Sequence, residues 1–136
     1  MEFHLARGVP IVALRQPKCI LLVEDELLIR ILVSDSLRDE GYEVVEAFNG
    51  DEAVEILTAG KAVDLVFSDV RMPGGTDGLG LLKFVKARFP DLPVILTSGH
   101  LDPRHASMAG AVAFLGKPYR IDEALEAVAC EVAKLQ

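Results

Sequence analysis

The sequence predicts an α/β fold in which a doubly wound, five-stranded parallel sheet carries helices on both faces. Two observations lead to this prediction. From Cys19 onward, short apolar runs alternate with stretches of helical periodicity, and the connections between them are short. The first, third and fourth runs are the most uniformly apolar, whereas Glu43 and Glu46 interrupt the second. We therefore expect the strand order 2-1-3-4-5, with the second strand at an edge and right-handed crossovers.

The individual elements follow from apolar spacing and from the residues that end helices. In the first helix, Ile29, Leu32, Val33 and Leu37 recur at helical spacing and should face the sheet, and Gly41 stands where a helix C-terminus favours glycine. The expected strands are residues 19–24, 42–47, 64–69, 93–97 and 111–115. The expected helices are residues 26–40, 50–59, 78–89 and 120–135, with a short one beginning near Pro103.

Length and composition restrict the class of protein. The 136 residues suffice for one domain with a hydrophobic core, which we place at 19–136, after an N-terminal extension or vector-derived remnant at 1–18. The net charge of −7 argues against a nucleic acid partner, and no apolar run is long enough to span a membrane. Cys19 and Cys130 lie far apart without metal-binding spacing, which predicts a reduced, cytoplasmic protein with two buried thiols.

Polar side chains stand at the carboxyl ends of four of the five expected strands. Glu24 and Asp25 follow the first strand, Asp69 ends the third, Thr97 ends the fourth and Lys117 follows the fifth. Ligands of doubly wound sheets bind at this edge, so the fold should bring the three carboxylates together. At an effective dielectric constant near 20, two carboxylates ~4 Å apart repel by roughly 4 kcal/mol, so such a cluster requires a cation.

The chemistry of these groups predicts a magnesium ion and a phosphoryl group. Carboxylates that leave room for water suit Mg²⁺, with Asp25 and Asp69 as direct ligands, Glu24 as a ligand through water and the backbone carbonyl of Arg71 completing the set. Lys117 can neutralise one phosphoryl oxygen. Further donors are the Thr97 hydroxyl and the backbone N–H of Ser98. Asp69 is then the expected nucleophile, and its attack on phosphorus forms an acyl phosphate.

Four strings along the chain resemble a known family. LLVEDE, FSDVRMPGGTDGL, VILTSG and FLGKPY are similar, in order and spacing, to the receiver domain of two-component response regulators, including single-domain regulators of the chemotaxis type. The resemblance extends over residues 19–136. It implies a flavodoxin-like fold, dependence on Mg²⁺, and phosphorylation of Asp69 by a histidine kinase or a histidine phosphotransfer protein.

The resemblance also implies a role for single residues. Thr97 matches the switch hydroxyl, Phe114 the aromatic switch position, and the bond between Lys117 and Pro118 is typically cis in the family. By the same match, Glu24 and Asp25 are the acidic pair, Asp69 is the phosphoacceptor and Lys117 is the family's lysine. The loop 73–78 is one residue longer than the common form.

Each assignment has a simpler structural alternative. Asp25 alone could cap the first helix, and Phe114 could be an ordinary core residue. Leu27, Leu28 and Ile31 lie off the core face of the first helix, which makes them either a partly covered flank or a docking surface for a kinase. His100 and His105 have no ligand at matching spacing, so we interpret them as surface histidines in a loop.

We therefore expect a single-domain, phosphoaccepting response regulator without an output domain. It would act through an unknown downstream protein target, with homodimer formation left open, and would not turn over an external substrate. Two alternatives belong to other classes. A phospho-independent interaction module would keep the fold without the chemistry. A small-molecule phosphatase would need a second acidic residue two positions beyond Asp69, where Arg71 stands.

Overall fold

The computed structural model describes residues 5–6, 9–10, 16–99 and 110–135. Within this part of the chain, one parallel sheet has the strand order β4-β3-β5-β6-β7. Its strands are β3 (Cys19–Val23), β4 (Glu43–Ala47), β5 (Leu65–Asp69), β6 (Val94–Ser98) and β7 (Ala113–Gly116). This is the predicted order 2-1-3-4-5, and the glutamate-interrupted strand is at the edge as expected.

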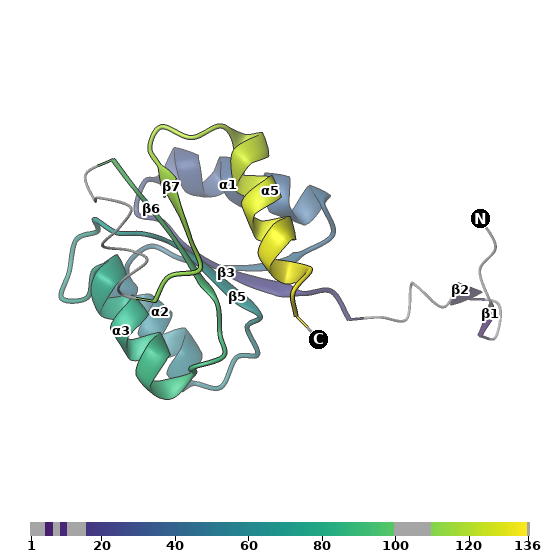
Figure 1. Ribbon diagram of the computed structural model, residues 1–136, viewed down its shortest axis with the longest axis horizontal. Coiled ribbons are helices and arrows are strands. Elements are labelled where there is room, and N and C mark those ends of the chain that lie inside the picture. Colours follow the sequence, from purple (N-terminus) through teal and green to yellow (C-terminus); the bar gives the residue numbers. More distant parts are fainter. Residues whose placement is uncertain (1–4, 7–8, 11–15, 100–109, 136) are drawn as a thin grey trace.

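In the part of the chain that the structure describes, four helices cover the two faces of the sheet. Helices α1 and α5 lie on one face and α2 and α3 on the other (Figure 1). Their bounds are α1 (Leu27–Asp39), α2 (Gly50–Thr58), α3 (Gly78–Arg88) and α5 (Ile121–Val132). These bounds confirm four of the predicted helices to within a few residues. The short helix expected near Pro103 falls outside the described residues.

Side chains that alternate in direction along the strands contribute to two separate hydrophobic cores, one on each face of the sheet. Leu21 and Val66 pack under α2 and α3, whereas Ile20, Leu22 and Phe67 pack under α1 and α5. Successive strand residues point to opposite faces, so a strand covered by helices on both sides must be apolar throughout. All five residues of β3, β5 and β6 are buried, which explains why those runs are the most apolar in the sequence.

Local signals fix where the helices begin and end. The Asn49 side chain accepts a hydrogen bond of 2.8 Å from Glu52 N at the start of α2, and Asp77 does the same with Gly80 N at the start of α3. Gly41, just after α1, has a φ of 97°, a conformation that glycine adopts without strain. The cap residue of α1 is Glu26, so Asp25 is not the helix cap that was its simpler interpretation.

Two predictions about burial are wrong. Leu32 was expected on the core face of α1, but it is 54% exposed, while Val33 and Leu37 are 2% and 0% exposed. Each residue turns an α-helix by about 100°, so the inward direction passes between Val33 and Leu37 and leaves Leu32 outside. Cys130 was expected to be buried and is exposed, because it lies two positions beyond the inward-facing Val128; Cys19 is buried as predicted.

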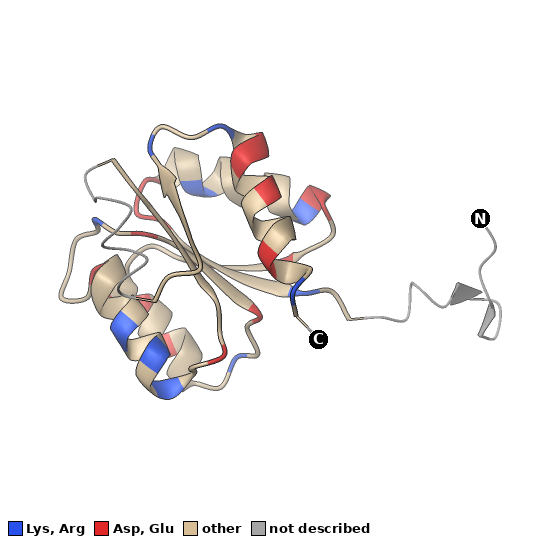
Figure 2. Cartoon of the chain, viewed as in Figure 1, with Lys and Arg blue, Asp and Glu red and all other residues tan. Residues whose placement is uncertain are grey.

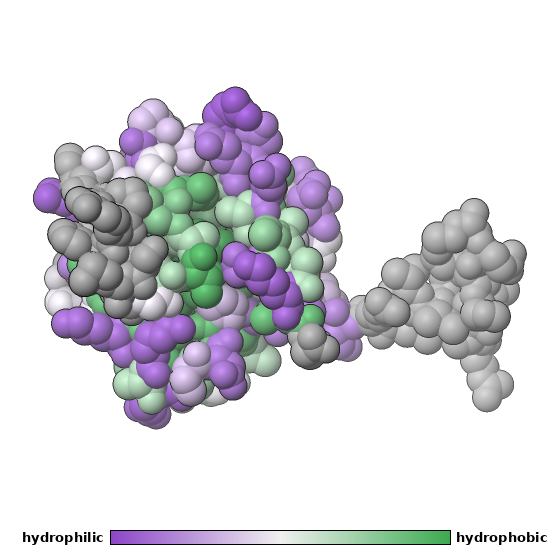
Figure 3. All heavy atoms as spheres, in the orientation of Figure 1, coloured by the Kyte–Doolittle hydropathy of each residue, from purple (hydrophilic) through white to green (hydrophobic). Residues whose placement is uncertain are grey.

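Charge and hydropathy differ between the helices and the sheet edge. Figure 2 shows acidic residues on α5 and basic residues on α3, and Figure 3 shows apolar atoms reaching the surface over β7 beside α5.

Among the described residues, no helix is both long and apolar enough to cross a membrane. In the N-terminal stretch, β1 (Leu5–Ala6) and β2 (Val9–Pro10) pair antiparallel in a sheet of their own. The division of the chain at residue 18 stays a prediction.

Replacement of Gly78 by alanine should destabilise the fold. A Cβ atom at this position would lie 2.6 Å from Val70 Cα and would also press on the backbone carbonyl of Asp69. Because both neighbours are backbone, the strand or helix α3 must shift. We expect Gly78→Ala to lower the free energy of unfolding by about 2 kcal/mol, measured by urea denaturation.

Gly80→Ala is the matched control on the same helix. Its Cβ would meet only the side chains of Thr76 and Asp77, at 3.3 and 3.5 Å. Alanine is favoured over glycine inside a helix by about 1 kcal/mol, so this variant should be at least as stable as wild type. Equal stability of Gly78→Ala and Gly80→Ala would contradict the close packing of α3 on β5.

Candidate functional site

The register of the sheet places the predicted site residues on one edge. Asp69, the last residue of β5, pairs with Thr97 on β6, and Ser98 pairs with Gly116 on β7, directly before Lys117. Hydrogen bonds from Val70 N to Thr97 O (2.9 Å) and from Lys117 N to Ser98 O (3.2 Å) continue the pairing beyond the strand ends. Residues far apart in the sequence thereby meet at the carboxyl ends of adjacent strands.

Three carboxylates form a compact cluster at this edge. One oxygen from each of Glu24, Asp25 and Asp69 lies within 4.8 Å of the others. Glu24 and Asp69 are 2% and 6% exposed, while Asp25 is exposed. The donor set consists of hard oxygens, and solvent reaches it from the side of Asp25. It therefore fits a small divalent cation that keeps part of its water shell.

Lys117 is the positive partner of the two buried acids. Its Nζ lies 2.9 Å from Asp69 Oδ2 and 3.1 Å from Glu24 Oε1, and its side chain is 19% exposed. Burial alone would lower the pKa of Lys117, but the hydrogen bonds and charges of Asp69 and Glu24 more than offset this and raise it above its ordinary value. Lys117 is therefore held as a cation.

One lysine does not fully compensate the cluster. Burial raises the pKa of Asp69, and the hydrogen bond and charge of Lys117 offset that rise only in part. Burial likewise raises the pKa of Glu24, against the hydrogen bond from Glu26 N and the charge of Lys117. Both carboxylates are thus destabilised as anions, which is the electrostatic condition under which a second cation binds favourably.

Thr97 carries a buried hydroxyl with no partner among the described residues. Its side chain is on a residue that is 1% exposed, and Oγ1 makes no hydrogen bond there. An unsatisfied buried hydroxyl costs about 1–3 kcal/mol, so a group that accepts its proton would be stabilising. Because Asp69 pairs with Thr97 across the strands, the free donor lies beside the carboxylate cluster.

A pocket of about 250 Å³ opens above the cluster. Asp69 and Lys117 line it together with Asp25, Ser98 and Arg71. Glu26 and Gly99 complete the lining. Thr97 is not among the lining residues. The bond between Lys117 and Pro118 is cis, as the family resemblance implied.

The remaining predicted residues are not among those that line the pocket above Asp69. Phe114, on β7, is partly buried and packs against the core under α2 and α3. Leu27, Leu28 and Ile31 are exposed on α1 by 57%, 80% and 44%. His100 and His105 fall outside the described residues. The structure therefore separates a polar centre at the sheet edge from an exposed apolar surface on the first helix.

Sequence reasoning missed two features beside the site. Exposed Leu32 lines an apolar pocket of about 360 Å³ between α1 and α5, together with Ile29, Tyr119 and Ile121. The Tyr119 ring packs edge-on against Phe67 with centroids 6.1 Å apart, and burial raises the pKa of Tyr119 to about 12. The sequence signal for Tyr119 is its position directly after Lys117-Pro118, at the end of the string FLGKPY.

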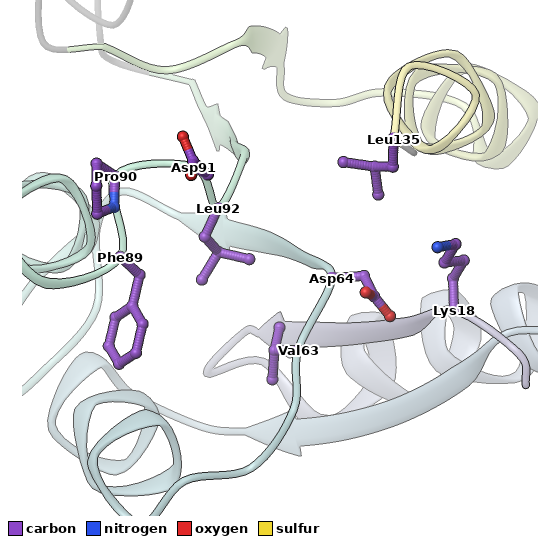
Figure 4. Close-up of a pocket in the computed structure, with 8 residues that line it drawn as sticks. All are labelled: Lys18, Val63, Asp64, Phe89, Pro90, Asp91, Leu92 and Leu135. Carbon is purple, nitrogen blue, oxygen red and sulfur yellow. The ribbon is translucent and has the colours of Figure 1, made fainter.

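A third pocket lies at the opposite end of the strands. It has a volume of about 420 Å³, with Phe89 and Leu92 on the connection between α3 and β6 and Leu135 beyond the end of α5 (Figure 4). Its Asp64 carboxylate already accepts a hydrogen bond of 2.8 Å from Cys19 N. Among the described residues, the three-carboxylate cluster is confined to the carboxyl edge, so we place the candidate site there.

Removing the charge of Asp69 should stabilise the metal-free protein. Asp69→Asn keeps the size of the side chain but removes one of the crowded, desolvated anions. We expect a rise of roughly 4 °C in Tm at pH 7 without divalent cations, which corresponds to about 1 kcal/mol in a domain of this size. Added Mg²⁺ should then stabilise wild type more than the variant, because wild type alone retains all three carboxylates.

The difference in stability between wild type and Asp69→Asn should also depend on pH. Because burial raises the pKa of Asp69 above 3.8, the folded protein holds this proton more tightly than the unfolded chain. The contribution of this bound proton to the stability of the folded protein is complete below the pKa of Asp69 in the unfolded chain. It is lost as the pH rises through the pKa of Asp69 in the folded protein. Thermal melts should thus give nearly equal stabilities below pH ~4 and a growing advantage for Asp69→Asn toward pH 7. A variant less stable than wild type at pH 7 without metal would contradict this.

The sequence is similar to those of known proteins. The family model of the response regulator receiver domain matches residues 20–129. A putative NtrX-like response regulator of Rickettsia felis is 39% identical over 123 residues, which cover 86% of this chain and 26% of that protein. The DNA-binding transcriptional regulator NtrC of Escherichia coli K12 is 41% identical over 118 residues, 85% of this chain and 25% of that protein. The chain spans about a quarter of the length of these curated relatives.

Solved structures agree with the sequence relatives. The receiver domain of NtrX from Brucella abortus is 37% identical with a TM-score of 0.79, and the match covers 85% of this chain and 99% of that one. The chemotaxis response regulator CheY4 of Vibrio cholerae is 28% identical with a TM-score of 0.77, over 85% of this chain and 99% of that one. From its sequence, its fold and these relatives, the chain belongs to the response regulator receiver domain family of two-component signalling.

Proposed function

We propose that this domain accepts a phosphoryl group on Asp69 and thereby changes its affinity for a protein partner. The observation that carries the proposal is the Lys117 ammonium, which bridges Asp69 and Glu24 at 2.9 and 3.1 Å beneath an open pocket. A lysine in this position holds the nucleophile in place and supplies positive charge where a phosphoryl oxygen arrives. A carboxylate placed only for stability would have no need of the adjoining pocket.

The proposed site holds Mg²⁺ through its cluster of oxygen ligands. Asp25 and Asp69 are direct ligands, Glu24 binds through water, and the Arg71 backbone carbonyl lies on the loop after β5. When bound, the ion neutralises charge on the carboxylates and on a phosphoryl oxygen. The raised pKa values of Glu24 and Asp69, which reflect the cost of burying their charges, support this role.

In the proposed reaction, a carboxylate oxygen of Asp69 attacks the phosphorus of a phosphohistidine. A bond forms between this oxygen and phosphorus while the bond from phosphorus to the histidine nitrogen breaks, and the electron pair leaves with the imidazole. Lys117 exchanges part of its contact with Asp69 for a phosphoryl oxygen. The backbone N–H of Ser98 donates to a second oxygen.

The proposed switch uses the unsatisfied hydroxyl of Thr97. A phosphoryl group on Asp69 provides the acceptor that Oγ1 lacks among the described residues, so phosphorylation favours movement of Thr97 toward the pocket. Phe114 has no hydroxyl, so its part in the switch is repacking of the ring against the core under α2 and α3. The surface altered in this way binds the downstream protein or a second copy of the chain.

The phosphodonor is proposed to dock on the first helix. Leu27, Leu28 and Ile31 are exposed next to the loop that carries Glu24 and Asp25. The apolar pocket between α1 and α5 continues this surface and includes Lys117 in its lining. A helix of a histidine kinase or histidine phosphotransfer protein that packs here would bring its phosphohistidine to the pocket above Asp69.

Two alternatives account for fewer of the observations. A phospho-independent interaction module would have no use for the carboxylate cluster, the bridging lysine and the free threonine hydroxyl together. A phosphatase acting on small molecules would need an acid–base group two positions after the nucleophile, where Arg71 stands. We therefore treat the domain as a phosphoacceptor and not as an enzyme with turnover. Its existence as a stand-alone regulator stays a prediction.

Intact mass spectrometry tests the proposed function. Incubation with acetyl phosphate and Mg²⁺ should add one phosphoryl group to wild type and none to Asp69→Asn, and chelation of Mg²⁺ should abolish the addition. Removal of the nucleophile eliminates the acceptor oxygen, so the expected loss is complete. Phosphorylation of Asp69→Asn to the wild-type extent would show that another residue is the acceptor.

Introduction of a negative charge on the first helix tests the docking surface. Ile31→Glu places a carboxylate in the exposed apolar surface, and desolvating it on docking is costly. With a histidine kinase that phosphorylates wild type, we expect the rate of phosphotransfer to fall at least ~10-fold, the factor given by about 1.4 kcal/mol. Phosphorylation by acetyl phosphate should remain unchanged, because Ile31 is not part of the pocket above Asp69.

Val112→Glu is the matched control for this experiment. Val112 is 43% exposed, almost the same as Ile31 at 44%, and it lies before β7 at the other end of the sheet. This variant should accept phosphoryl groups from the kinase at the wild-type rate. Equal rates for Ile31→Glu and Val112→Glu would eliminate the first helix as the docking surface.

A further inference from the structure

We propose that Arg30 is a positioning residue for the metal and phosphoryl site, acting through the backbone of the acidic pair. The proposal rests on the proposed function, and it concerns a residue outside the pocket. Arg30 lies on α1, and its side chain is 17% exposed. Among the described residues that line the pocket above Asp69, Arg30 is absent, so any influence on the site must pass through a neighbour.

Arg30 holds the loop that carries the carboxylates. Its Nη1 donates a hydrogen bond of 2.8 Å to the backbone carbonyl of Glu24. The N–H of Glu24 donates to Ala47 O at 3.0 Å, which is the last backbone bond between β3 and the edge strand on this side. The chain therefore leaves the sheet at Glu24, and the Arg30 guanidinium fixes the first carbonyl beyond the strand.

Fixing this carbonyl constrains Asp25. The carbonyl of Glu24 and the N–H of Asp25 belong to one planar peptide group, so the direction of the first determines the direction of the second. The backbone of Asp25 in turn determines where its exposed carboxylate lies. The Glu24 side chain is separately held by Glu26 N at 3.1 Å and by Lys117 Nζ at 3.1 Å. Arg30 thus orients Asp25, the exposed member of the acidic pair.

Arg30 is itself anchored on the edge strand. Its Nε donates to Glu46 Oε1 at 3.3 Å, and the other oxygen of Glu46 accepts from Ser34 Oγ at 3.0 Å and from Arg38 Nη2 at 3.2 Å. Three donors on α1 therefore hold one carboxylate on β4. Through this network, the Glu24 carbonyl is held in place relative to both the sheet and helix α1.

The guanidinium geometry is required for this function. One group must donate in two directions, to a carbonyl and to a carboxylate, which the planar fork of arginine does and a lysine ammonium on a flexible stem does poorly. Partners that orient metal ligands from outside the site typically change metal affinity 10–100-fold when they are removed. Loss of Arg30 should therefore weaken Mg²⁺ binding without removing any ligand atom.

Arg38 provides a closely matched control on the same helix. Arg38 donates to the same Glu46 carboxylate, and its Nη2 donates to a backbone carbonyl at 3.0 Å, but that carbonyl belongs to Val44 and not to the acidic pair. Arg30→Met and Arg38→Met thus remove equal charge, one contact with Glu46 and one hydrogen bond to a backbone carbonyl. They differ in whether the carbonyl adjoins the metal site.

Mg²⁺ titration by calorimetry and amide hydrogen exchange without metal test the proposal. Arg30→Met should bind Mg²⁺ about 10-fold more weakly than wild type and Arg38→Met, with Arg30→Lys restoring only part of the loss. Without metal, the amides of Asp25 and Glu26 should exchange faster in Arg30→Met alone. The exchange arm needs no bound ion, and thermal melts establish that the variants are folded.

Each result separates this proposal from the proposed function. If wild type binds Mg²⁺ and Arg30→Met binds it with the same affinity, the positioning role is overturned and the proposed function remains intact. An equal loss in Arg38→Met would overturn it as well, since the effect would then follow from Glu46 or helix stability. Absence of Mg²⁺ binding by wild type would overturn the proposed function, and this proposal with it.

Discussion

The site depends on one ammonium group held between two buried carboxylates. Lys117 Nζ contacts both Asp69 and Glu24, yet burial still raises the pKa values of the two acids above their ordinary range. A buried pair that lost its lysine would leave charges that neither solvent nor a partner compensates. With its lysine, the cluster remains folded but retains excess negative charge. That balance lets a stable protein keep three acids together in an arrangement that could hold a divalent cation.

The sheet supplies the precision that this balance requires. Glu24 leaves β3, Asp69 ends β5 and Lys117 follows β7, so the bridge connects three strands across the sheet. Buried parallel strands have a register fixed by two hydrophobic cores, because a slip of one residue would turn each strand over. The apolar residues of β3, β5 and β6 therefore determine distances at the site, although none of them takes part in its chemistry.

The sequence predicted the fold, and it predicted that Glu24, Asp69 and Lys117 would lie close together, because both depend on patterns read along the chain. Strand order followed from the apolar runs, and the site followed from polar residues at their ends. Burial on a helix was harder to predict, since Leu32 and Val33 differ by about 100° of rotation, and which of them faces inward is decided by how α1 packs. Arg30 and Glu46 were missed for a related reason: a charged residue on a helix and one on an edge strand carry no signal of their contact until the strand and helix are paired.

The two basic side chains contact different groups of Glu24. Lys117 lines the pocket and contacts the Glu24 carboxylate, so an incoming phosphoryl oxygen would compete for its charge. Arg30 contacts the Glu24 carbonyl and is not among the residues that line the pocket, so it would have no such competitor. Under the proposed function, the interaction that changes on phosphorylation is therefore separate from the one that stays in place. Because Arg30 is bound to Glu46 on the edge strand, the loop with Asp25 would keep its position while Lys117 changes partners.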